Sequence, residues 1–492
     1  AYTDRVTDQN VDYTDYLFVG QYLPYYICDY YVTYTTYAPN NLPTGTCGAP
    51  NLLVDSTTNT EVTTHEFRIN APISDTVDVT AGVFFSDLEL LELNLFTYPS
   101  SVDNDIDYAP NYALTDISVT GDRSDSGKSS VRAGAGWFSA GPFSEPVIFF
   151  NDIKRTDKQQ GVFGEVNIAL QDDVELTLGA RYYDIEVDFE GSANSSFGNG
   201  FGNPDEQRFG SNLSVQYAPG NPNGYPDKAI SDGVIGKATL SWNPSEDSMY
   251  YLTWSEGFRP GLLNRPVGSS NADGSYVVKP EVESDEVTNF EFGWKTVSMD
   301  GRLRFNGAAF MVDISGLQST IFDPSIVNLF FSDNAADAEI TGVEGDFVYI
   351  TDSDLVLSGA FSVLDSEITK SLVPTTDVIV GTDLAFAPGY QGNINARKEW
   401  GMSSGNTGHW QAQMVLSDKS YSDIMEPNKA VQDSYSYFNF RYGMSNDDWT
   451  SEIYIDNVFD KRADISNTFV FDRSRVAVIK PRTIGLRYKK TF

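Results

Sequence analysis

Apolar residues occupy every second position in segment after segment of this chain, and this alternation constrains the fold more than any other feature. Between residues 162 and 182 the apolar positions alternate with polar ones such as Glu165, Asn167 and Arg181. A period of two is that of a β-strand, whose successive side chains point to opposite faces. The alternation is interrupted by a short turn at 171–173 and then resumes. These residues are therefore predicted to form a β-hairpin with one apolar and one polar face.

The same pattern predicts sixteen strands along the chain. The turns within the hairpins are short, the connections between hairpins are long, and the two kinds alternate strictly. All long connections therefore fall on one side of the sheet, as expected for a membrane barrel and not for a soluble sandwich. The predicted strands are 1–6, 61–70, 76–85, 162–170, 174–182, 234–242, 249–256, 290–294, 303–311, 343–349, 355–363, 390–398, 410–416, 437–444, 449–455 and 476–492.

Composition agrees with a barrel that crosses a membrane with strands. The mean hydropathy is −0.30, and no run approaches the roughly 18 apolar residues that a membrane helix needs. Alternating strands conceal their apolar face from such averages. Trp242, Trp410 and Trp449 lie near short turns, where an aromatic girdle is expected. A sheet in lipid must also close on itself, because unpaired backbone groups are costly in hydrocarbon.

The formal net charge is −36, which argues against nucleic acid as a partner because a phosphate backbone requires clustered Lys and Arg. Cys28 and Cys47 are the two cysteines, and they lie in one polar stretch. They are predicted to form a disulfide that contributes about 3 kcal/mol in the chain-entropy model. Such bonds persist in oxidising compartments, including the periplasm and the cell surface.

The end of the chain is predicted to be a strand that faces lipid. Ile484, Leu486 and Tyr488 share the parity of Phe492, whereas Arg487 lies on the other face. Lys490 interrupts the apolar parity, which a bilayer interface tolerates because lysine can extend its ammonium into water. A terminal strand that ends in phenylalanine is similar to the assembly signal of bacterial outer-membrane barrels.

Several stretches resemble the TonB-dependent outer-membrane receptors. Each is weak alone, but their order and spacing are specific and cover most of residues 61–492. They are 161–182 (GVFGEVNIALQDDVELTLGARY), 250–261 (YYLTWSEGFRPG), 281–313 with FEFGWK and FNGAAFMVD, 342–346 (GVEGD), 387–390 (APGY), 457–461 (NVFDK) and 481–488 (PRTIGLRY).

The resemblance implies an all-β, transmembrane antiparallel barrel. Members of the family have 22 strands around an N-terminal plug and import scarce nutrients with energy from TonB. Residues 1–492 are then expected to form a single barrel domain with about 16 C-terminal strands, without the plug and about six opening strands. The implied cargo is a ferric siderophore, another metal chelate, cobalamin or an oligosaccharide. The alternatives are a passive sixteen-stranded porin and a structural or adhesive barrel.

The expected location is the bacterial outer membrane, with long connections outside the cell and short turns in the periplasm. The expected partners are the TonB complex through the plug, outer-membrane lipid, lipopolysaccharide and the imported small molecule or oligosaccharide. On one hairpin, Phe290, Phe292, Trp294, Leu303 and Phe305 are predicted to face lipid, and Glu291, Lys295 and Arg304 are predicted to face the lumen.

Ligand-binding residues are expected on the long connections, because a solute from outside meets these first. The best candidate segment is residues 256–265, in which Phe258 and Arg259 precede the stiffening Pro260 and Asn264 follows it. Arg259 suits an anionic chelate or a pair of sugar hydroxyls, and it could equally hold a plug loop. A second long connection adds Trp137, Phe138, Phe149 and Phe150, which bind ligand or pack the connections together.

No catalytic motif is found, so an enzyme is not expected. His65 and His409 have no serine or cysteine motif around them and are interpreted as structural. No resident cofactor is expected, apart from Ca²⁺ in acidic outer connections. Asp103, Asp105 and Asp107 alternate as in a calcium loop, but Tyr108 and Leu114 stand where that loop needs glycine and glutamate.

Overall fold

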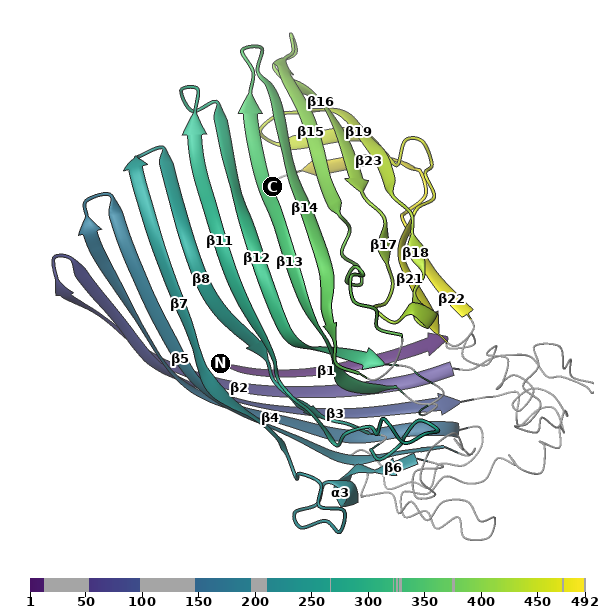
Figure 1. Cartoon of the computed structure of the whole chain (residues 1–492). Helices are drawn as coiled ribbons and strands as arrows, with labels where there is room; N and C mark the ends of the chain where they lie inside the picture. The colour runs from purple at the N-terminus through teal and green to yellow at the C-terminus, as the bar shows by residue number, and fades with distance from the viewer. Residues whose placement is uncertain are drawn as a thin grey trace, which may run out of the picture.

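A computed structural model gives the three-dimensional structure of the chain (Figure 1). It describes residues 1–12, 53–97, 147–195, 210–265, 267–321, 323, 326, 330–373, 377–470 and 473–490. Among these residues, no helix is long and apolar enough to cross a membrane.

Sixteen antiparallel strands follow one another in chain order through a single curved sheet, as the alternation predicted. Each strand between the first and the last pairs with the one before it and the one after it in this series. The strands are β1 (Tyr2–Asp12), β2 (Leu53–Ser74), β3 (Val77–Thr97), β4 (Val147–Gln171), β5 (Val174–Ser195), β7 (Ala229–Ser245), β8 (Ser248–Arg259), β11 (Asp285–Ser298), β12 (Leu303–Ile321), β13 (Phe331–Ile350), β14 (Leu355–Ser371), β15 (Tyr390–Gly401), β16 (Thr407–Ser417), β19 (Tyr435–Ser445), β20 (Trp449–Asp456) and β23 (Thr483–Lys490).

Smaller elements lie in the connections. The short β6 (Gly210–Asn212) pairs with the end of β5 and leads into a single helical turn, α3 (Leu213–Gln216). The remaining elements are the two-stranded pairs β9 (Leu262–Leu263) with β10 (Glu281–Val282), β17 (Ser420–Tyr421) with β18 (Val431–Gln432) and β21 (Asp464–Val470) with β22 (Arg473–Val478), and the 3₁₀ turn η4 (Glu426–Asn428).

The first and last strands of the series are the edges of the sheet. Within the described residues β1 pairs with β2 alone and β23 with β20 alone. Edge strands carry a row of backbone N–H and C=O groups that a further strand can use.

Short turns and long connections alternate strictly around the sheet, as predicted. Asp172 and Asp173 alone separate β4 from β5. The turn from β11 to β12 contains Met299, Asp300 and Gly301, all with positive φ (55°, 55° and 83°). Left-handed backbone reverses the chain tightly, and glycine adopts it without steric cost.

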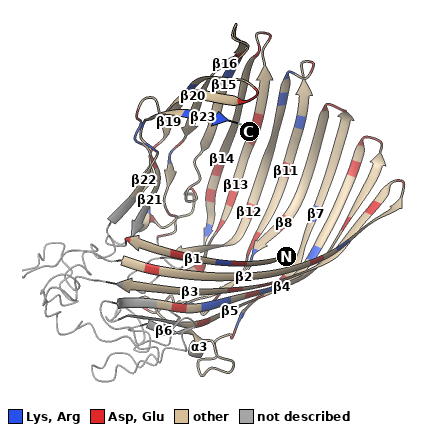
Figure 2. Ribbon diagram, turned by 180° about the vertical axis from the view of Figure 1, so that it is seen from behind, with Lys and Arg blue, Asp and Glu red and all other residues tan. Residues whose placement is uncertain are grey.

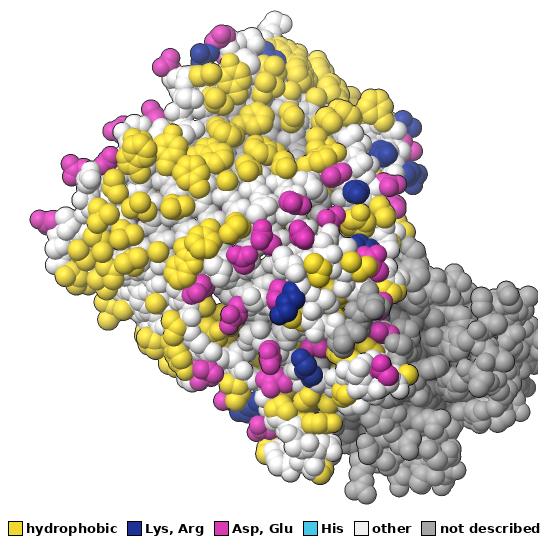
Figure 3. All heavy atoms as spheres, viewed as in Figure 1, with side chains coloured by type: hydrophobic (Ala, Val, Ile, Leu, Met, Phe, Trp, Pro, Cys, Tyr) yellow, Lys and Arg dark blue, Asp and Glu magenta, His cyan; other side chains and the backbone are white. Residues whose placement is uncertain are grey.

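The outward face of the sheet is apolar, and the inward face is polar. Phe290 and Phe292 on β11 are 46% and 47% exposed on the outward face. Their partners on the same face are Trp254 and Leu252 of β8. The alternate positions carry Glu291 and Lys295, which line a hollow on the inward face. Figure 3 shows the result as a broad apolar band across the wall, in agreement with the predicted lipid and lumen faces.

Glycines in the wall lie beneath aromatic rings of the neighbouring strand. A Cβ added to Gly293 would lie 2.1 Å from the ring of Tyr251, and one added to Gly307 would lie 2.4 Å from Trp294. Each glycine is the direct cross-strand partner of its ring. The absent side chain lets the ring lie flat on the sheet, so these pairs fix the register.

Most of the strands are longer than their alternation predicted. The segment predicted as a long loop up to about residue 60 contains the start of β2, which begins at Leu53 and pairs with β1 as far as Asp12. β3, β4 and β5 extend to match it. At the other end, the predicted strand 476–492 is divided: β22 ends at Val478 and β23 begins at Thr483. Cross-strand pairing decides these limits where the alternation is weak.

The buried apolar clusters lie where the long connections pack against the ends of the wall strands. One cluster joins the connections that leave β8, β12, β14 and β16, with Tyr276, Ile326, Val378 and Met425 among its buried members. A second packs Leu213 and Tyr217 against Ile185 and Val187 of β5. Toward the short turns, the described part of the wall has one apolar face to the outside and one polar face to the inside.

Candidate functional site

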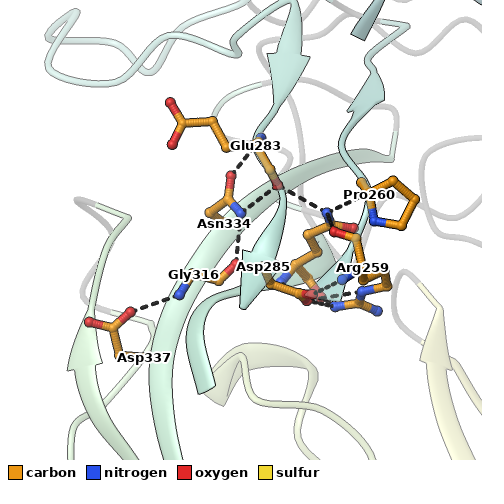
Figure 4. Close-up of polar contacts among 8 residues, drawn as sticks. Arg259, Pro260, Glu283, Asp285, Gly316, Asn334 and Asp337 are labelled. Carbon is orange, nitrogen blue, oxygen red and sulfur yellow. Dashed lines mark hydrogen bonds and ion pairs between the residues drawn. The ribbon is translucent and has the colours of Figure 1, made fainter. Parts of the chain in front are cut away.

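The segment predicted to bind ligand begins at the end of β8, and its arginine is held by a buried carboxylate. Asp285, the first residue of β11, is 3% exposed. The Arg259 Nε donates to Asp285 Oδ2 at 2.9 Å, Nη2 donates to the same oxygen, and the Arg259 backbone N–H donates to Oδ1 at 3.1 Å. Arg259 and Asp285 are direct cross-strand partners, so strand register brings them together (Figure 4).

Gln318 of β12 completes this contact from the other side. Its backbone N–H donates to Asp285 Oδ2 at 3.3 Å, and its carbonyl accepts from Arg259 Nη2 at 3.0 Å. The Gln318 side chain donates to the Pro260 carbonyl and the Glu283 carbonyl, at 2.9 Å in each case. The start of the connection after β8 is therefore tied to β11 and β12.

Asn334 of β13 extends the network. Its Nδ2 donates to the Glu283 and Gly316 carbonyls at 2.9 and 2.7 Å, and its Oδ1 accepts from the Glu283 N–H at 2.9 Å. Asp337 accepts from the Gly316 N–H at 2.8 Å (Figure 4). Gly316 has φ +67° and lies at a register shift of β12. These polar groups replace the ladder hydrogen bonds that the irregular backbone lacks there.

Asn264 is buried and its amide is committed to backbone groups. Nδ2 donates to the Lys279 carbonyl at 2.9 Å and the Ser332 carbonyl at 2.8 Å, and Oδ1 accepts from the Ser332 N–H at 2.9 Å. The Tyr217 hydroxyl donates to the Asn264 carbonyl. Burial raises the pKa of Tyr217, which keeps this donor protonated. Asn264 is 3% exposed, so this geometry does not favour the ligand contact predicted for it.

Phe258 stacks on Tyr183 of β5 with ring centroids 3.6 Å apart and planes 12° apart. It packs against the buried cluster around Leu213 and Tyr217. Phe258 therefore packs the connections together, the role considered as the alternative to ligand binding for the aromatic residues of the long connections. Arg259 differs from its neighbours because its side chain is 52% exposed. Its bonds within the described residues use Nε and Nη2, so Nη1 is the donor left for a solute.

Several predicted site residues cannot be placed. Trp137, Phe138, Cys28, Cys47 and the weak calcium candidates Asp103, Asp105 and Asp107 lie outside the described residues. Their roles in ligand binding, disulfide formation and calcium binding stay predictions. Within the described ranges, no group of three or more His, Cys, Asp or Glu residues is arranged to hold a metal ion.

Phe149 and Phe150 are in a strand, which corrects their assignment to a long connection. β4 begins at Val147, and the two residues pair with Phe96 and Leu95 of β3. The position of their side chains is not described, so contact with ligand stays a prediction. The apolar run around them lacks a clear period of two, which is why the alternation did not include them.

The inward wall holds a polar hollow that the sequence analysis did not single out as a site. It has a volume of about 360 Å³ and is lined by Tyr251, Glu291, Asn306 and Asp346. The Tyr251 hydroxyl donates to Glu291 at 2.6 Å, and Arg304 pairs with Asp346 at 3.1 Å. The alternating polar residues of these hairpins were the only sign of this hollow in the sequence. That these residues from four strands lie together follows from the strand register, which the sequence did not show.

His409 belongs to a charged cluster on the inward wall near the short turns. Its Nε2 lies 3.2 Å from Glu452 Oε2, and both side chains are buried. Arg441 and Arg487 lie 3.6 and 3.4 Å from the other oxygen of Glu452. The cluster joins β16, β19, β20 and β23, a structural role of the kind expected for His409. The other histidine, His65, is exposed on the outward face.

An antiparallel wall of sixteen strands, apolar outside and polar inside, with all long connections at one rim, defines the chain as an outer-membrane type β-barrel. The sequence matches the family described as TonB dependent receptor-like, beta-barrel over residues 1–458. The chain therefore belongs to this family, whose members are outer-membrane transporters and not enzymes. No curated protein sequence matches it.

Solved structures with the same fold are receptors of this family. The ferric yersiniabactin uptake receptor FyuA from Yersinia pestis aligns with a TM-score of 0.63 and 15% identity over 92% of this chain and 56% of that chain. The ferric citrate transporter FecA aligns with a TM-score of 0.58 and 11% identity over 90% of this chain and 57% of that chain. The siderophore receptor PiuA from Acinetobacter baumannii aligns with a TM-score of 0.55 and 18% identity over 89% of this chain and 56% of that chain. The chain thus spans little more than half the length of these proteins.

Proposed function

We propose that this chain forms most of the barrel wall of a receptor that imports a ferric siderophore across the outer membrane with energy from TonB. Family membership supports the transport class. The narrower cargo is supported by the functions of the aligned structures, which include uptake of ferric yersiniabactin and transport of ferric citrate. Other metal chelates, cobalamin and oligosaccharides are the competing cargoes.

The observation that carries the proposal is the pair of sheet edges. In a passive porin of sixteen strands the first and last strands pair with each other, because an open edge is costly in lipid. Here, within the described residues, β1 and β23 each have a partner on one side alone. We propose that about six further strands close the barrel and that a plug fills it and contacts TonB.

The long connections are proposed to face the outside of the cell. They are packed through buried clusters and held by Asn264, Gln318 and Asn334. A fixed outer rim presents binding groups in a constant arrangement, which lowers the entropy lost when a ligand binds.

The test is uptake by the full-length receptor in cells that lack other receptors for ferric chelates. Radiolabelled iron is supplied as a ferric siderophore, with and without TonB. A receptor gives saturable uptake that is lost without TonB. Uptake that rises linearly with concentration and does not depend on TonB would establish the porin alternative. If no ferric chelate is taken up but cobalamin or an oligosaccharide is imported in a TonB-dependent way, the receptor has another cargo.

A further inference from the structure

One sector of the inward wall, on β15, β16 and β19, carries uncharged polar residues. Asn395, Gln413 and Asn439 are direct cross-strand partners and form a single row. They lie on the inward face because they alternate with residues exposed on the outward face, such as Ile394 and Phe438. We call the polar residues of this sector the neutral face: Gln391, Asn393, Asn395, Gln413, Tyr437 and Asn439.

The neutral face differs in charge from the neighbouring sectors of the inward wall. The charged residues of β15 are confined to 397–399, at its short-turn end, and β16 has none (Figure 2). Elsewhere, ion pairs lie on the inward face of the wall. Lys237 of β7 pairs with Glu165 at 3.4 Å, and Arg304 of β12 pairs with Asp346 at 3.1 Å. The inward wall therefore has charged sectors and one uncharged sector.

Hydrogen bonds among the amides hold them in place and leave donors toward the lumen. Asn439 Nδ2 donates to Gln413 Oε1 at 2.8 Å, and Asn395 Nδ2 donates to Asn393 Oδ1 at 3.4 Å. The backbone N–H of Asn457 donates to Asn439 Oδ1 at 2.9 Å. Within the described residues, the amide nitrogens of Gln413 and Asn393 have no partner, and both residues are half-buried. These two amides can therefore donate to a solute.

The neutral face extends from the outer end of β15 toward the short turns. Gln391 and Asn395 are four residues apart on the same face, which is about 13 Å along a strand. The next row toward the short turns places Gln411 between its direct partners Arg397 and Arg441. A solute that moves inward along this sector therefore meets uncharged donors and acceptors first and two arginines afterwards.

Uncharged amides suit a solute that has to move on. A hydrogen bond between neutral groups contributes a net of about 0.5–1.5 kcal/mol, and one to a charged group contributes about 1.5–3 kcal/mol. Passage through a protein requires several weak sites in place of one strong site. An amide offers both donors and an acceptor, so it can bind the oxygen atoms, hydroxyl groups and amide groups of a polar chelate whatever the net charge of that chelate.

We propose that the neutral face lines the passage by which the imported chelate crosses the barrel, and that the chelate contacts it only in transit. A protein segment that stays in the lumen gains more from the charged sectors, because charge-assisted hydrogen bonds are stronger. A moving solute gains more from the sector that has no such groups. The occupant is therefore a polar chelate rich in oxygen. This inference rests on the proposed function, since it takes the chain to be the wall of a TonB-dependent receptor.

The experiment measures access to single cysteines on the inward wall of the full-length receptor in cells. Gln413→Cys lies on the neutral face, and Thr239→Cys on β7 is the matched control. Gln413 is six residues from Thr407, the first residue of β16, and Thr239 is six residues from Ser245, the last residue of β7. Both positions are thus equally far from the short turns. A maleimide that does not cross membranes is added outside, with and without TonB, and labelling of the wild type is subtracted.

TonB is expected to raise the labelling rate of Gln413→Cys severalfold and to leave that of Thr239→Cys unchanged. An equal rise at both positions, or a rise at Thr239→Cys alone, would overturn the proposal. No rise at either position would also overturn it, and TonB-dependent uptake in the same cells would then show that the proposed function stands. If Gln413→Cys does not reach the cell surface, Asn395→Cys in the same row takes its place.

Uptake provides a second readout. Gln413→Glu keeps the shape of the side chain and adds a negative charge, so uptake of a radiolabelled ferric siderophore of negative net charge should slow severalfold. Binding of the same siderophore to cells without TonB should not change, and Gln413→Asn, which keeps the amide, should retain uptake. Equal uptake by Gln413→Glu and the wild type would contradict the proposal. TonB-dependent labelling of Gln413→Cys without uptake of any ferric chelate would count against the proposed cargo and not against the passage.

Discussion

Replacing Asp285 by alanine removes the acceptor that holds the start of the connection after β8. The Arg259 guanidinium loses its counter-ion, and the backbone N–H groups of Arg259 and Gln318 lose their acceptor. Breaking a buried ion pair costs about 3–5 kcal/mol, and each orphaned buried donor adds to this. Because the Arg259 side chain is 52% exposed, water recovers part of its charge solvation. We therefore expect a loss of about 3 kcal/mol, at the low end of that range.

The assay is equilibrium unfolding of the full-length receptor in lipid vesicles, followed by tryptophan fluorescence. A double-mutant cycle with Arg259→Ala isolates the pair, because Asp285→Ala should cost much less once the arginine is absent. The control is Arg302→Ala at the short-turn rim. Its partner Asp352 has a side chain that is 91% exposed, so this change should cost less than about 1 kcal/mol.

Equal losses for Asp285→Ala and Arg302→Ala would refute the view that the Asp285 contact is structurally important. The cycle also separates two roles of Arg259. A purely structural arginine loses uptake in proportion to the folded receptor at the cell surface. Loss of uptake by Arg259→Ala at unchanged surface expression would show that its free Nη1 contacts the solute.

Phe292→Arg on the outward face should lower the free energy of unfolding by about 2–4 kcal/mol near mid-membrane, more than Glu291→Arg on the inward face. Equal losses for the two variants in vesicle unfolding would contradict the face assignment. Tyr276→Phe removes a 2.6 Å hydrogen bond to buried Asp333 and should destabilise the outer connections by about 1–3 kcal/mol, seen as faster hydrogen exchange there while the wall is unchanged. Burial raises the pKa of Asp423 above its ordinary 3.8, so its contribution to stability is full below that value and is lost as pH rises through the raised pKa. Asp423→Asn should remove this dependence from the pH profile of exchange in the connection after β16, and an unchanged profile would count against it.

The alternation of residues predicted all sixteen strands of the wall and, for hairpins such as 162–182 and 290–311, which side of the sheet is apolar. Side chains at i and i+2 share a face wherever the backbone is extended, so this information is local and survives without an alignment. The rim that carries the long connections followed from connection length, another local property. The TonB-dependent receptor family could likewise be identified from short stretches such as 342–346 and 457–461.

The candidate site could be predicted only in part. Residues 256–265 were identified as an important segment, but the sequence suggested an arginine that binds ligand or holds a plug loop. The structure pairs Arg259 with Asp285, 26 residues farther along the chain. Asn264 likewise finds its partners at Lys279 and Ser332. Partners so distant are set by the register between β8, β11 and β13, which composition and spacing do not contain.

What the sequence determined by itself is thus the set of strands, their two faces and the order of short and long connections, because each depends on neighbours within a few residues. The tertiary structure decided how far the strands extend and which polar groups meet. Asp313, Glu339 and Glu367 are separate acids in the sequence, and only their pairing across β12, β13 and β14 makes them adjacent. A shift of one residue in register would turn each strand's side chains to the other face, so these three carboxylates would no longer be neighbours.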